Sequence, residues 1–210
     1  MNIIQESDNN RISTVERIDG VAISFAGDNN VITFSKGTKF SGCRFTISGN
    51  NSRITIGASK YGIYNLQVYA THSQLVIGND FSCWGCDMRL HEPNSEISIG
   101  NDCMFSSEIA LYATDVHAIY DDETKTVLNF SKPIRIGNHV WVGRRVGILK
   151  GSEINDNSIV GFGSVVNRKF TESNICIAGV PAQIVKSGIN WDRRNPYNYD
   201  LFVKSRDKAQ

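Results

Sequence analysis

The chain has 210 residues, 40% of them hydrophobic and 20% charged, which is the composition of an ordinary folded domain and excludes a disordered or collagen-like chain. The 22 Lys and Arg residues and the 21 Asp and Glu residues give a formal net charge of +1, which indicates neither a nucleic-acid partner nor an acidic membrane surface. No apolar run reaches the roughly 18 residues of a membrane span, and residues 1–10 lack the pattern of a signal peptide. We therefore expect a cytoplasmic protein without membrane insertion.

The first half of the chain carries a loose repeat of apolar residues. Ile54, Leu75 and Ile97 lie 21 and 22 positions apart, and each is followed two positions later by an isoleucine and then by a glycine. The same frame reaches back to Ile32 and Phe34. Proline is scarce, glycine is common, and sustained helical spacing is hard to find before the C-terminal end, so the chain is predicted to be rich in β-strands.

The segment Cys83-Trp84-Gly85-Cys86 has the C-x-x-C spacing of redox and zinc sites. No second C-x-x-C or His pair accompanies it. The four histidines also lack the close pair that a carbonic-anhydrase-like zinc site would need. We therefore predict no metal and expect small thiols at inward positions. The five cysteines are an odd number at uneven spacing, which favours reduced thiols.

Residues 114–132 (TDVHAIYDDETKTVLNFSK) match no repeat and contain several charged residues. This predicts a loop ejected from the repeating structure, and long ejected loops often carry function.

The second half of the chain carries a strict apolar period of six. Its members are Ile136, Val142, Ile148, Ile154, Val160 and Val166. This period does not fit one face of a helix, but it suits a strand and turn repeated three times per coil of a β-solenoid. We expect coils of 18 residues here and of 21 to 22 residues earlier, with the apolar side chains stacked in inward ladders.

Three ordered segments of this half resemble the hexapeptide-repeat acyltransferases. They are PIRIGNHVWVGRRVGILKG from Pro133, NDNSIVGFGSVV from Asn155 and IAGVPAQIVK from Ile177. Within that family, IGNDCMFSSEI from Ile99 and TDVHAIY from Thr114 are most similar to bacterial O-acetyltransferases of polysialic acid and capsular polysaccharides.

The resemblance implies an all-β fold, a single left-handed parallel β-helix that uses acetyl-coenzyme A (acetyl-CoA). It also implies a closed homotrimer in which neighbouring prisms form the site between them. We place the β-helix domain at residues 1–186, with the loop 114–132 ejected from it, and a C-terminal appendage at residues 187–210.

Acetyl transfer to a sugar hydroxyl needs a base for the hydroxyl proton, and histidine suits that task near neutral pH. The resemblance assigns this role to His117, which lies in the ejected loop in a Thr-Asp-x-His context. His72 and His91 are expected to be solvated turn residues or acceptor contacts, and His139 an exposed polar residue at a repeat turn.

Three further side chains are candidates around the base. Asp115 could orient the imidazole as the acid of a triad does, although a local turn hydrogen bond explains it equally well. Glu108 is a weaker candidate for the same role. Trp141 stands beside the glycine of a repeat turn, too large for a narrow interior, so it should point outward. By resemblance it borders the cleft where donor and acceptor meet, and packing against a neighbouring subunit is the alternative.

Coenzyme A is an anionic nucleotide with a long pantetheine arm, so its groove needs exposed backbone N–H groups and cations. The resemblance places the donor-binding residues at Gly143, Arg144, Gly161, Phe162, Asn167, Arg168, Gln183 and Lys186. Phe162 and Gln183 differ from the residues of many family members, and Lys169 is a candidate to replace the cation that Gln183 does not supply.

The resemblance thus implies an acetyl-CoA-dependent O-acetyltransferase acting on a sugar hydroxyl, with sialic acid or another unit of a bacterial surface polysaccharide as acceptor. No acyl-enzyme is needed, because no Ser or Cys near His117 forms a nucleophile motif. One alternative is N-acetylation of a nucleotide-linked amino sugar. Another is a non-catalytic β-solenoid that binds a surface, although Thr33, Thr46 and Thr55 form no flat Thr-x-Thr ladder.

Overall fold

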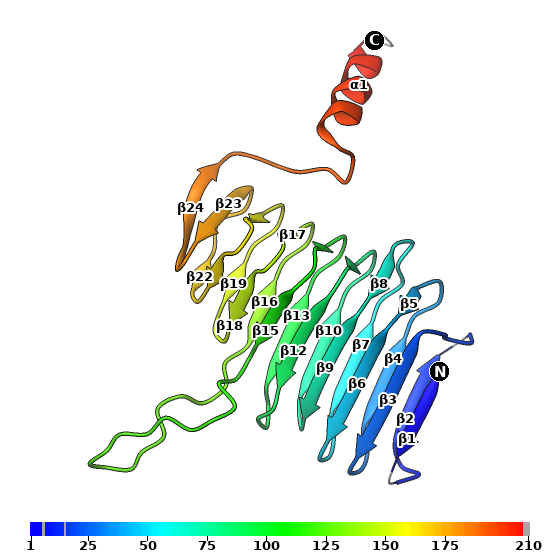
Figure 1. Cartoon of the computed structure of the whole chain (residues 1–210), viewed down its shortest axis with the longest axis vertical. Helices are drawn as coiled ribbons and strands as arrows, with labels where there is room; N and C mark the ends of the chain where they lie inside the picture. Colours follow the sequence, from blue (N-terminus) through cyan, green and yellow to red (C-terminus); the bar gives the residue numbers. More distant parts are fainter. Residues whose placement is uncertain (6, 15, 208–210) are drawn as a thin grey trace.

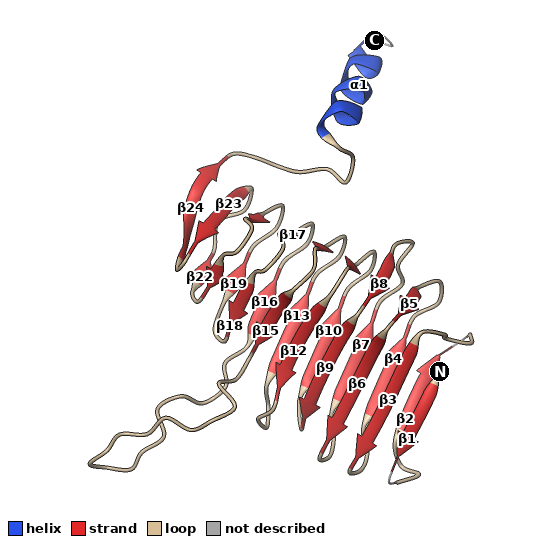
Figure 2. Cartoon of the chain, in the orientation of Figure 1, coloured by secondary structure: helices blue, strands red, loops and turns tan. Residues whose placement is uncertain are grey.

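The computed structural model describes residues 1–5, 7–14 and 16–207, which form a three-sided prism of parallel strands with a helix beyond its C-terminal end (Figure 1). The chain winds around the prism, so each coil adds strands to the three sides in turn (Figure 2). We name the sides sheets A, B and C, and each corner by the two sheets it joins.

Over the described residues, each sheet contains eight strands. Sheet A comprises β1 (Asn2–Gln5), β3 (Val21–Ala26), β6 (Cys43–Ser48), β9 (Leu66–Thr71), β12 (Cys86–Leu90), β15 (Ile109–Tyr112), β18 (Gly147–Leu149) and β21 (Val165–Val166). Sheet B comprises β2 (Arg11–Thr14), β4 (Val31–Phe34), β7 (Arg53–Ile56), β10 (Gln74–Ile77), β13 (Glu96–Ile99), β16 (Ile134–Ile136), β19 (Glu153–Ile154) and β22 (Lys169–Phe170). Sheet C comprises β5 (Lys39–Ser41), β8 (Gly62–Tyr64), β11 (Ser82–Cys83), β14 (Met104–Phe105), β17 (Trp141–Val142), β20 (Ile159–Val160), β23 (Ile175–Gly179) and β24 (Ala182–Ser187).

The inward ladders follow the repeats of the sequence. Ile54 pairs with Leu75, which pairs with Ile97 in parallel register on sheet B. All six residues of the strict period are buried, and Ile136 pairs with Ile154, 18 positions later. Alternate strand residues point inward because successive side chains of a strand face opposite sides of the sheet. The predicted parallel β-helix and both coil lengths are confirmed.

The prism narrows from its N-terminal to its C-terminal end (Figure 1). On sheet A the strands shorten from six residues in β3 to two in β21. The longer coils of the first half therefore form the wide end, and the hexad coils form the narrow end.

The corner between sheets B and C is held by a polar ladder that runs from coil to coil. The side-chain oxygen of Asn101 accepts from the backbone N–H of Asn79 at 2.8 Å, and Asn138 accepts from Asn101 at 2.9 Å. Asp156 accepts from Asn138 at 2.6 Å. In successive coils, one residue of this corner has a positive φ. His139 is that residue in its own coil, with a φ of 54°. The polar residues between the apolar positions thus make the turns.

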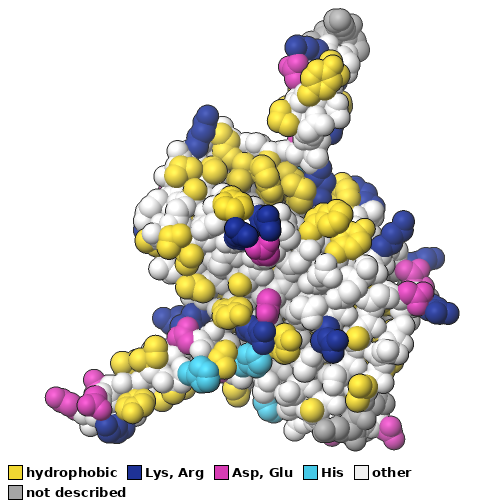
Figure 3. Space-filling view, in the orientation of Figure 1, with side chains coloured by type: hydrophobic (Ala, Val, Ile, Leu, Met, Phe, Trp, Pro, Cys, Tyr) yellow, Lys and Arg dark blue, Asp and Glu magenta, His cyan; other side chains and the backbone are white. Residues whose placement is uncertain are grey.

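The predicted loop leaves the prism at the A–B corner, between β15 and β16 (Figure 1). It is a hairpin-like excursion in which Tyr120 and Val127 form an isolated antiparallel bridge. Hydrophobic side chains are exposed along it (Figure 3). They are Val116, Ile119, Tyr120, Leu128 and Phe130. The ejection of this segment is confirmed, and its exposed apolar surface has no cover in a single chain.

The chain after the last coil forms an antiparallel hairpin, a linker and a helix. β24 folds back on β23, and residues 188–195 then lead to α1 (Pro196–Asp207), which projects beyond the prism (Figure 1). Among the described residues, no helix has the length and apolar character needed to cross a membrane.

The C-x-x-C segment is part of the core. Cys83 and Cys86 are buried, which confirms the prediction of inward thiols. Burial raises the pKa of the Cys83 thiol to about 12, so the thiol stays protonated and unreactive at neutral pH. The intervening Trp84 points outward.

Candidate functional site

His117 lies exposed near the base of the ejected loop, and one asparagine fixes the backbone around it. Asn129 donates from its side-chain amide to the carbonyl of His117 at 2.8 Å and to the Asp115 carboxylate at 2.9 Å. Its amide oxygen accepts from the backbone N–H of Ile119 at 2.7 Å. The loop backbone on either side of His117 is therefore tied to a single side chain.

Lys150, from the following coil, braces the same segment. Its Nζ donates to the Asp115 carboxylate at 2.5 Å and to the Asn129 carbonyl at 2.6 Å. Burial raises the pKa of Asp115, but the hydrogen bonds from Lys150 and Asn129 outweigh that effect and lower it below its ordinary value. Asp115 is thus an ionised partner of Lys150 at neutral pH.

Glu92, from the preceding coil, holds both ends of the loop. One carboxylate oxygen accepts from the hydroxyl of the buried Thr114, and the other accepts from the backbone N–H of Ser131 at 2.8 Å. The backbone N–H of Lys132 also donates to the carbonyl of Ala113 at 3.2 Å. Sequence analysis did not identify Glu92, Asn129 or Lys150, because no spacing in the sequence reports which corner residues of different coils meet.

Within one chain, Glu108, the weaker of the two candidates for orienting His117, lies away from it. Glu108 lies at the C–A corner, where it pairs with Arg144 and, at 2.7 Å, with Arg145. Hydrogen bonds from Arg145 and Arg144 lower the pKa of Glu108. Asp115 lies near His117 in the loop, but its carboxylate is bound to Lys150 and Asn129 rather than to the imidazole.

Two other histidines lie along the A–B corner in earlier coils. His72 accepts from the backbone N–H of Asn50 through Nδ1 at 3.2 Å, so it serves the corner turn. The centroid of the His91 ring lies 6.0 Å from that of the Tyr69 ring. Burial lowers the pKa of His91, and the positive charge of Arg89 lowers it further.

The expectation that His139 is merely an exposed polar residue is wrong. Its ring stacks on the indole of Trp191 with centroids 4.1 Å apart and planes 9° apart. Nδ1 lies 2.7 Å from the Asp102 carboxylate, and Nε2 lies 3.0 Å from the Trp191 carbonyl. Both partners are acceptors, so the two hydrogen bonds form together only when the imidazole carries both protons.

The linker before α1 is therefore docked on the prism rather than free. Trp191 donates its indole N–H to the carbonyl of His139 at 2.8 Å. Arg193 donates to the Asp102 carboxylate at 3.1 Å and to the Ser82 hydroxyl at 2.8 Å, and its guanidinium lies 3.8 Å from the centre of the Tyr61 ring. The appendage from residue 187 is rich in aromatic residues, but no pattern in the sequence predicts where it binds.

Trp141 points outward from β17 with 38% of its surface exposed, as predicted. Its ring centroid lies 6.2 Å from that of Trp191. Within the described residues, its indole N–H has no hydrogen-bond partner, unlike that of Trp191. It borders a hollow of about 750 Å³ beside the linker and a second of about 400 Å³ on sheet C. Trp141 is therefore placed to contact a ligand.

The predicted donor-binding glycines do not offer free amides. The N–H of Gly143 donates to Val160 and that of Gly161 to Ile177, each at 2.8 Å. At Gly143, a Cβ would lie 2.9 Å from the backbone N of Phe162, so coil stacking requires the glycine. The exposed turn amides of Arg144 and Phe162 find no acceptor in the part of the chain that the structure describes, and these can serve a ligand.

The predicted cations differ in what they already bind. Arg168 donates to the side chain of Gln183 and, at 3.2 Å, to the carbonyl of Ala182. Lys169 pairs with Glu153 at 3.3 Å. Lys186 on β24 is exposed and has no ion pair with any described residue. It is therefore the most available of the predicted cations for a phosphate.

The predicted site residues fall into two groups on one chain. His117, Asn167 and Lys169 lie at or beside the A–B corner, where Asn167 and Lys169 line a hollow of about 460 Å³. Trp141 lies on sheet C, and the turns that carry Gly143, Arg144, Gly161 and Phe162 form the C–A corner. Sheet A separates the groups, so one chain does not bring His117 to Trp141.

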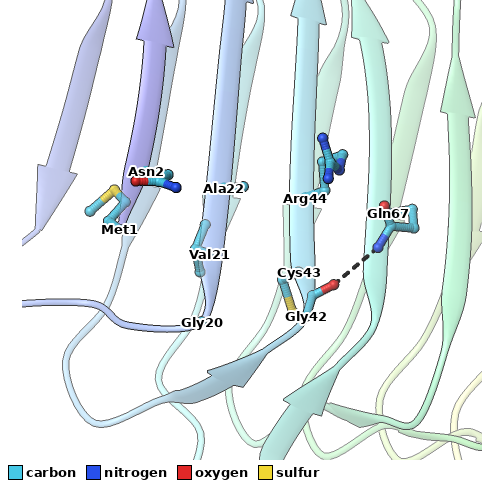
Figure 4. Close-up of a pocket in the computed structure, with 9 residues that line it drawn as sticks. All are labelled: Met1, Asn2, Gly20, Val21, Ala22, Gly42, Cys43, Arg44 and Gln67. Carbon is cyan, nitrogen blue, oxygen red and sulfur yellow. Dashed lines mark hydrogen bonds between the residues drawn. The ribbon is translucent and has the colours of Figure 1, made fainter.

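A further hollow, of about 530 Å³, lies on sheet A near the N-terminus. Figure 4 shows its lining, in which Gln67 donates to the carbonyl of Gly42 at 3.1 Å. None of the predicted site residues lines it. Across the described residues, there is no group of three or more His, Cys, Asp or Glu side chains that could hold a metal ion.

Comparisons with known proteins confirm the resemblance. Residues 133–168 match the family described as bacterial transferase hexapeptide (six repeats). The chain is 35% identical over 189 residues to the polysialic acid O-acetyltransferase of Neisseria meningitidis, covering 80% of this chain and 88% of that protein. The crystal structure of the polySia specific acetyltransferase NeuO superposes with a TM-score of 0.85 at 26% identity, covering 100% of this chain and 98% of that one. The structure of the polysialic acid O-acetyltransferase OatWY gives a TM-score of 0.79 at 30% identity, with coverages of 97% and 95%.

Proposed function

Because the chain belongs to the hexapeptide-repeat acetyltransferases, in the group of the polysialic acid O-acetyltransferases, we propose that it transfers the acetyl group of acetyl-CoA to a hydroxyl of sialic acid units in a polysaccharide. The similarity over the whole chain carries this proposal. The repeat family alone accounts for residues 133–168, whereas the likeness to NeuO spans the early coils, the ejected loop and the tail.

In the proposed mechanism, the neutral imidazole of His117 accepts the proton of the sugar hydroxyl as that oxygen attacks the thioester carbonyl carbon. The carbon–sulfur bond breaks, and the departing thiolate takes the proton from the imidazolium. The unpartnered indole N–H of Trp141 is suited to donate to the carbonyl oxygen as negative charge develops on it. The hydrogen bonds of Asn129 and Lys150 to the loop hold His117 in place during this exchange.

The same reaction requires His117 and Trp141 to meet across a contact between copies. We propose a closed trimer in which the A–B corner of one prism faces the C–A corner of the next and the part of sheet C that carries Trp141. Joining two different surfaces by a rotation that closes gives a ring. The five exposed apolar side chains of the loop support this arrangement, since they lack a cover in the single chain.

Acetyl-CoA would lie in the same contact. The free turn amides of Arg144 and Phe162 suit the carbonyls of the pantetheine arm, and Lys186 suits a phosphate. In the bound state, this co-substrate supplies the acetyl group as an activated thioester.

Acetyl-CoA consumption with polysialic acid, compared with nucleotide-linked amino sugars, tests the proposal. The wild type should turn over with the polysaccharide and not with the nucleotide-linked amino sugars. His117→Ala should keep its fold and oligomeric state by sedimentation and lose about 10²–10⁴ in turnover, the contribution of a general base. Turnover with amino sugars alone, or wild-type turnover of His117→Ala, would contradict it.

A further inference from the structure

The outer surface of sheet C bears a hollow of about 400 Å³ that we call the aromatic groove. Its lining includes the aromatic side chains of Tyr61, Tyr64, Trp84 and Trp141. The rings of Tyr64 and Trp84 are stacked, with centroids 4.8 Å apart and planes 25° apart. Trp84 has 66% of its surface exposed, which is unusual for so large an apolar side chain.

The local sequence builds this groove. Because Cys83 and Cys86 both fill the core, Trp84 between them is turned to the outside. Gly62 lies beneath the Tyr64 ring, and a Cβ there would lie 2.3 Å from ring atoms. The glycine therefore lets Tyr64 lie flat against the strand, where it meets Trp84. The C-x-x-C segment thus contributes an aromatic platform rather than a redox or metal site.

The chemistry of the groove suits a sugar. Flat aromatic rings pack against the apolar face of a pyranose, and Tyr and Trp also present a polar edge to its hydroxyls. Two small polar residues, Ser82 and Ser106, also line the groove. From β8 to β17 the groove crosses three strand spacings, or about 14 Å, which exceeds the length of one sugar unit.

The charged side chains at the end of the groove beside Tyr61 are paired with one another. Lys60 pairs with Asp80, and Arg193 pairs with Asp102, which also lies 2.7 Å from Nδ1 of His139. The neighbouring Asp192 and Arg194 are paired with each other. The aromatic rings, rather than an excess of charge, therefore give this groove its chemical character.

We propose that the aromatic groove binds units of the acceptor chain next to the unit that is acetylated, and that its ligand is a linear oligosaccharide. This inference rests on the proposed function, because the groove runs away from Trp141. The enzyme would then recognise a chain of sugars, with contacts remote from the reacting hydroxyl.

Trp84→Ala tests this with two acceptors, polysialic acid and free sialic acid. The KM for the polymer should rise about tenfold through loss of one aromatic contact, with kcat and the KM for acetyl-CoA unchanged. The KM for the free sugar should not change. Gly62→Ala, which displaces the Tyr64 ring, should have the same effect. Tyr197→Ala, which removes an exposed aromatic ring from α1, is the matched control and should leave both acceptors unaffected.

Titration calorimetry with unmodified polysialic acid, without acetyl-CoA, separates the two proposals. If the wild type binds the polymer and Trp84→Ala binds it about tenfold more weakly, the groove stands even if acetylation of that polymer fails. Equal KM changes for polymer and free sugar would overturn it. So would dissociation of Trp84→Ala in sedimentation, because the groove would then be covered by a second copy.

Discussion

Replacing Glu92 with alanine should release both ends of the ejected loop while leaving the prism folded. The carboxylate of Glu92 accepts from the Thr114 hydroxyl and from the Ser131 backbone N–H, and it lies outside the buried apolar ladders. A hydrogen bond to a charged group contributes about 1.5–3 kcal/mol, so losing two should weaken the closed loop by about 3–6 kcal/mol.

Native-state hydrogen exchange measures this release directly. The Ser131 amide can exchange only when its bond to Glu92 opens, so its exchange rate should rise by roughly 10²–10⁴ in Glu92→Ala. The buried amides of sheet B should keep their protection. Turnover should fall as well, because His117 loses its fixed position in the loop.

Glu123→Gln is the matched control, since Glu123 is an exposed carboxylate in the same loop. It should change neither the Ser131 exchange rate nor turnover. An unchanged exchange rate at Ser131 in Glu92→Ala would refute the role of this clamp. Accelerated exchange with full turnover would show that the clamp holds the loop but does not place His117 for catalysis.

Three further predictions concern the core, the donor site and the ejected loop. Val160→Asp should abolish soluble expression, because an unpaired carboxylate in the core costs several kcal/mol, and folded soluble protein would disprove the register. Coenzyme A should raise the Tm, less in Lys186→Ala than in Lys60→Ala, and equal shifts would remove Lys186 from the donor site. The lowered pKa of Asp115 means that its stabilisation of the loop is complete above a pH of about 4 and is lost as the pH falls further. The protection of the loop amides, measured relative to unfolded amides at the same pH, should therefore fall in acid, and less so in Asp115→Asn.

Much of the prism could be predicted from the sequence because its core is one-dimensional. Each inward residue meets its equivalent one coil earlier and later, so the spacing that relates Ile54 to Leu75 is also the spacing of their contact. The outward direction of the Trp141 side chain could also be predicted, because a large ring beside a turn glycine has room only outside the prism.

The candidate site was less predictable because it is built from contacts between side chains at the corners of the prism. The polar contacts of Glu92, Asn129 and Lys150 join residues 10 to 39 positions apart through side chains that have no periodic signature. Glu108 is near His117 in the sequence, but within one chain a whole sheet separates the C–A corner from the loop. The contacts of His139 could not be predicted because its partner, Trp191, lies 52 positions later in the sequence.

The two readings of Trp141 differ in what happens when its ring is removed. If the ring borders the cleft, Trp141→Ala should keep its oligomeric state and lose turnover or acceptor affinity, because its exposed surface and free N–H face a ligand. If the ring mainly packs against a neighbouring copy, the alanine variant should dissociate, as loss of a buried aromatic anchor costs a few kcal/mol.

Trp141→Phe separates the apolar surface of the ring from its N–H group. Phenylalanine keeps most of the contact area that faces Trp191 and the aromatic groove, but it cannot donate a hydrogen bond. We expect Trp141→Phe to assemble and to bind acceptor normally while its kcat falls, because the lost donor acts on the charge that develops during transfer. Sedimentation combined with kinetics on both variants decides the matter. Full turnover in Trp141→Phe would remove the indole N–H from the mechanism, and dissociation of Trp141→Ala would move the residue from the cleft to the subunit contact.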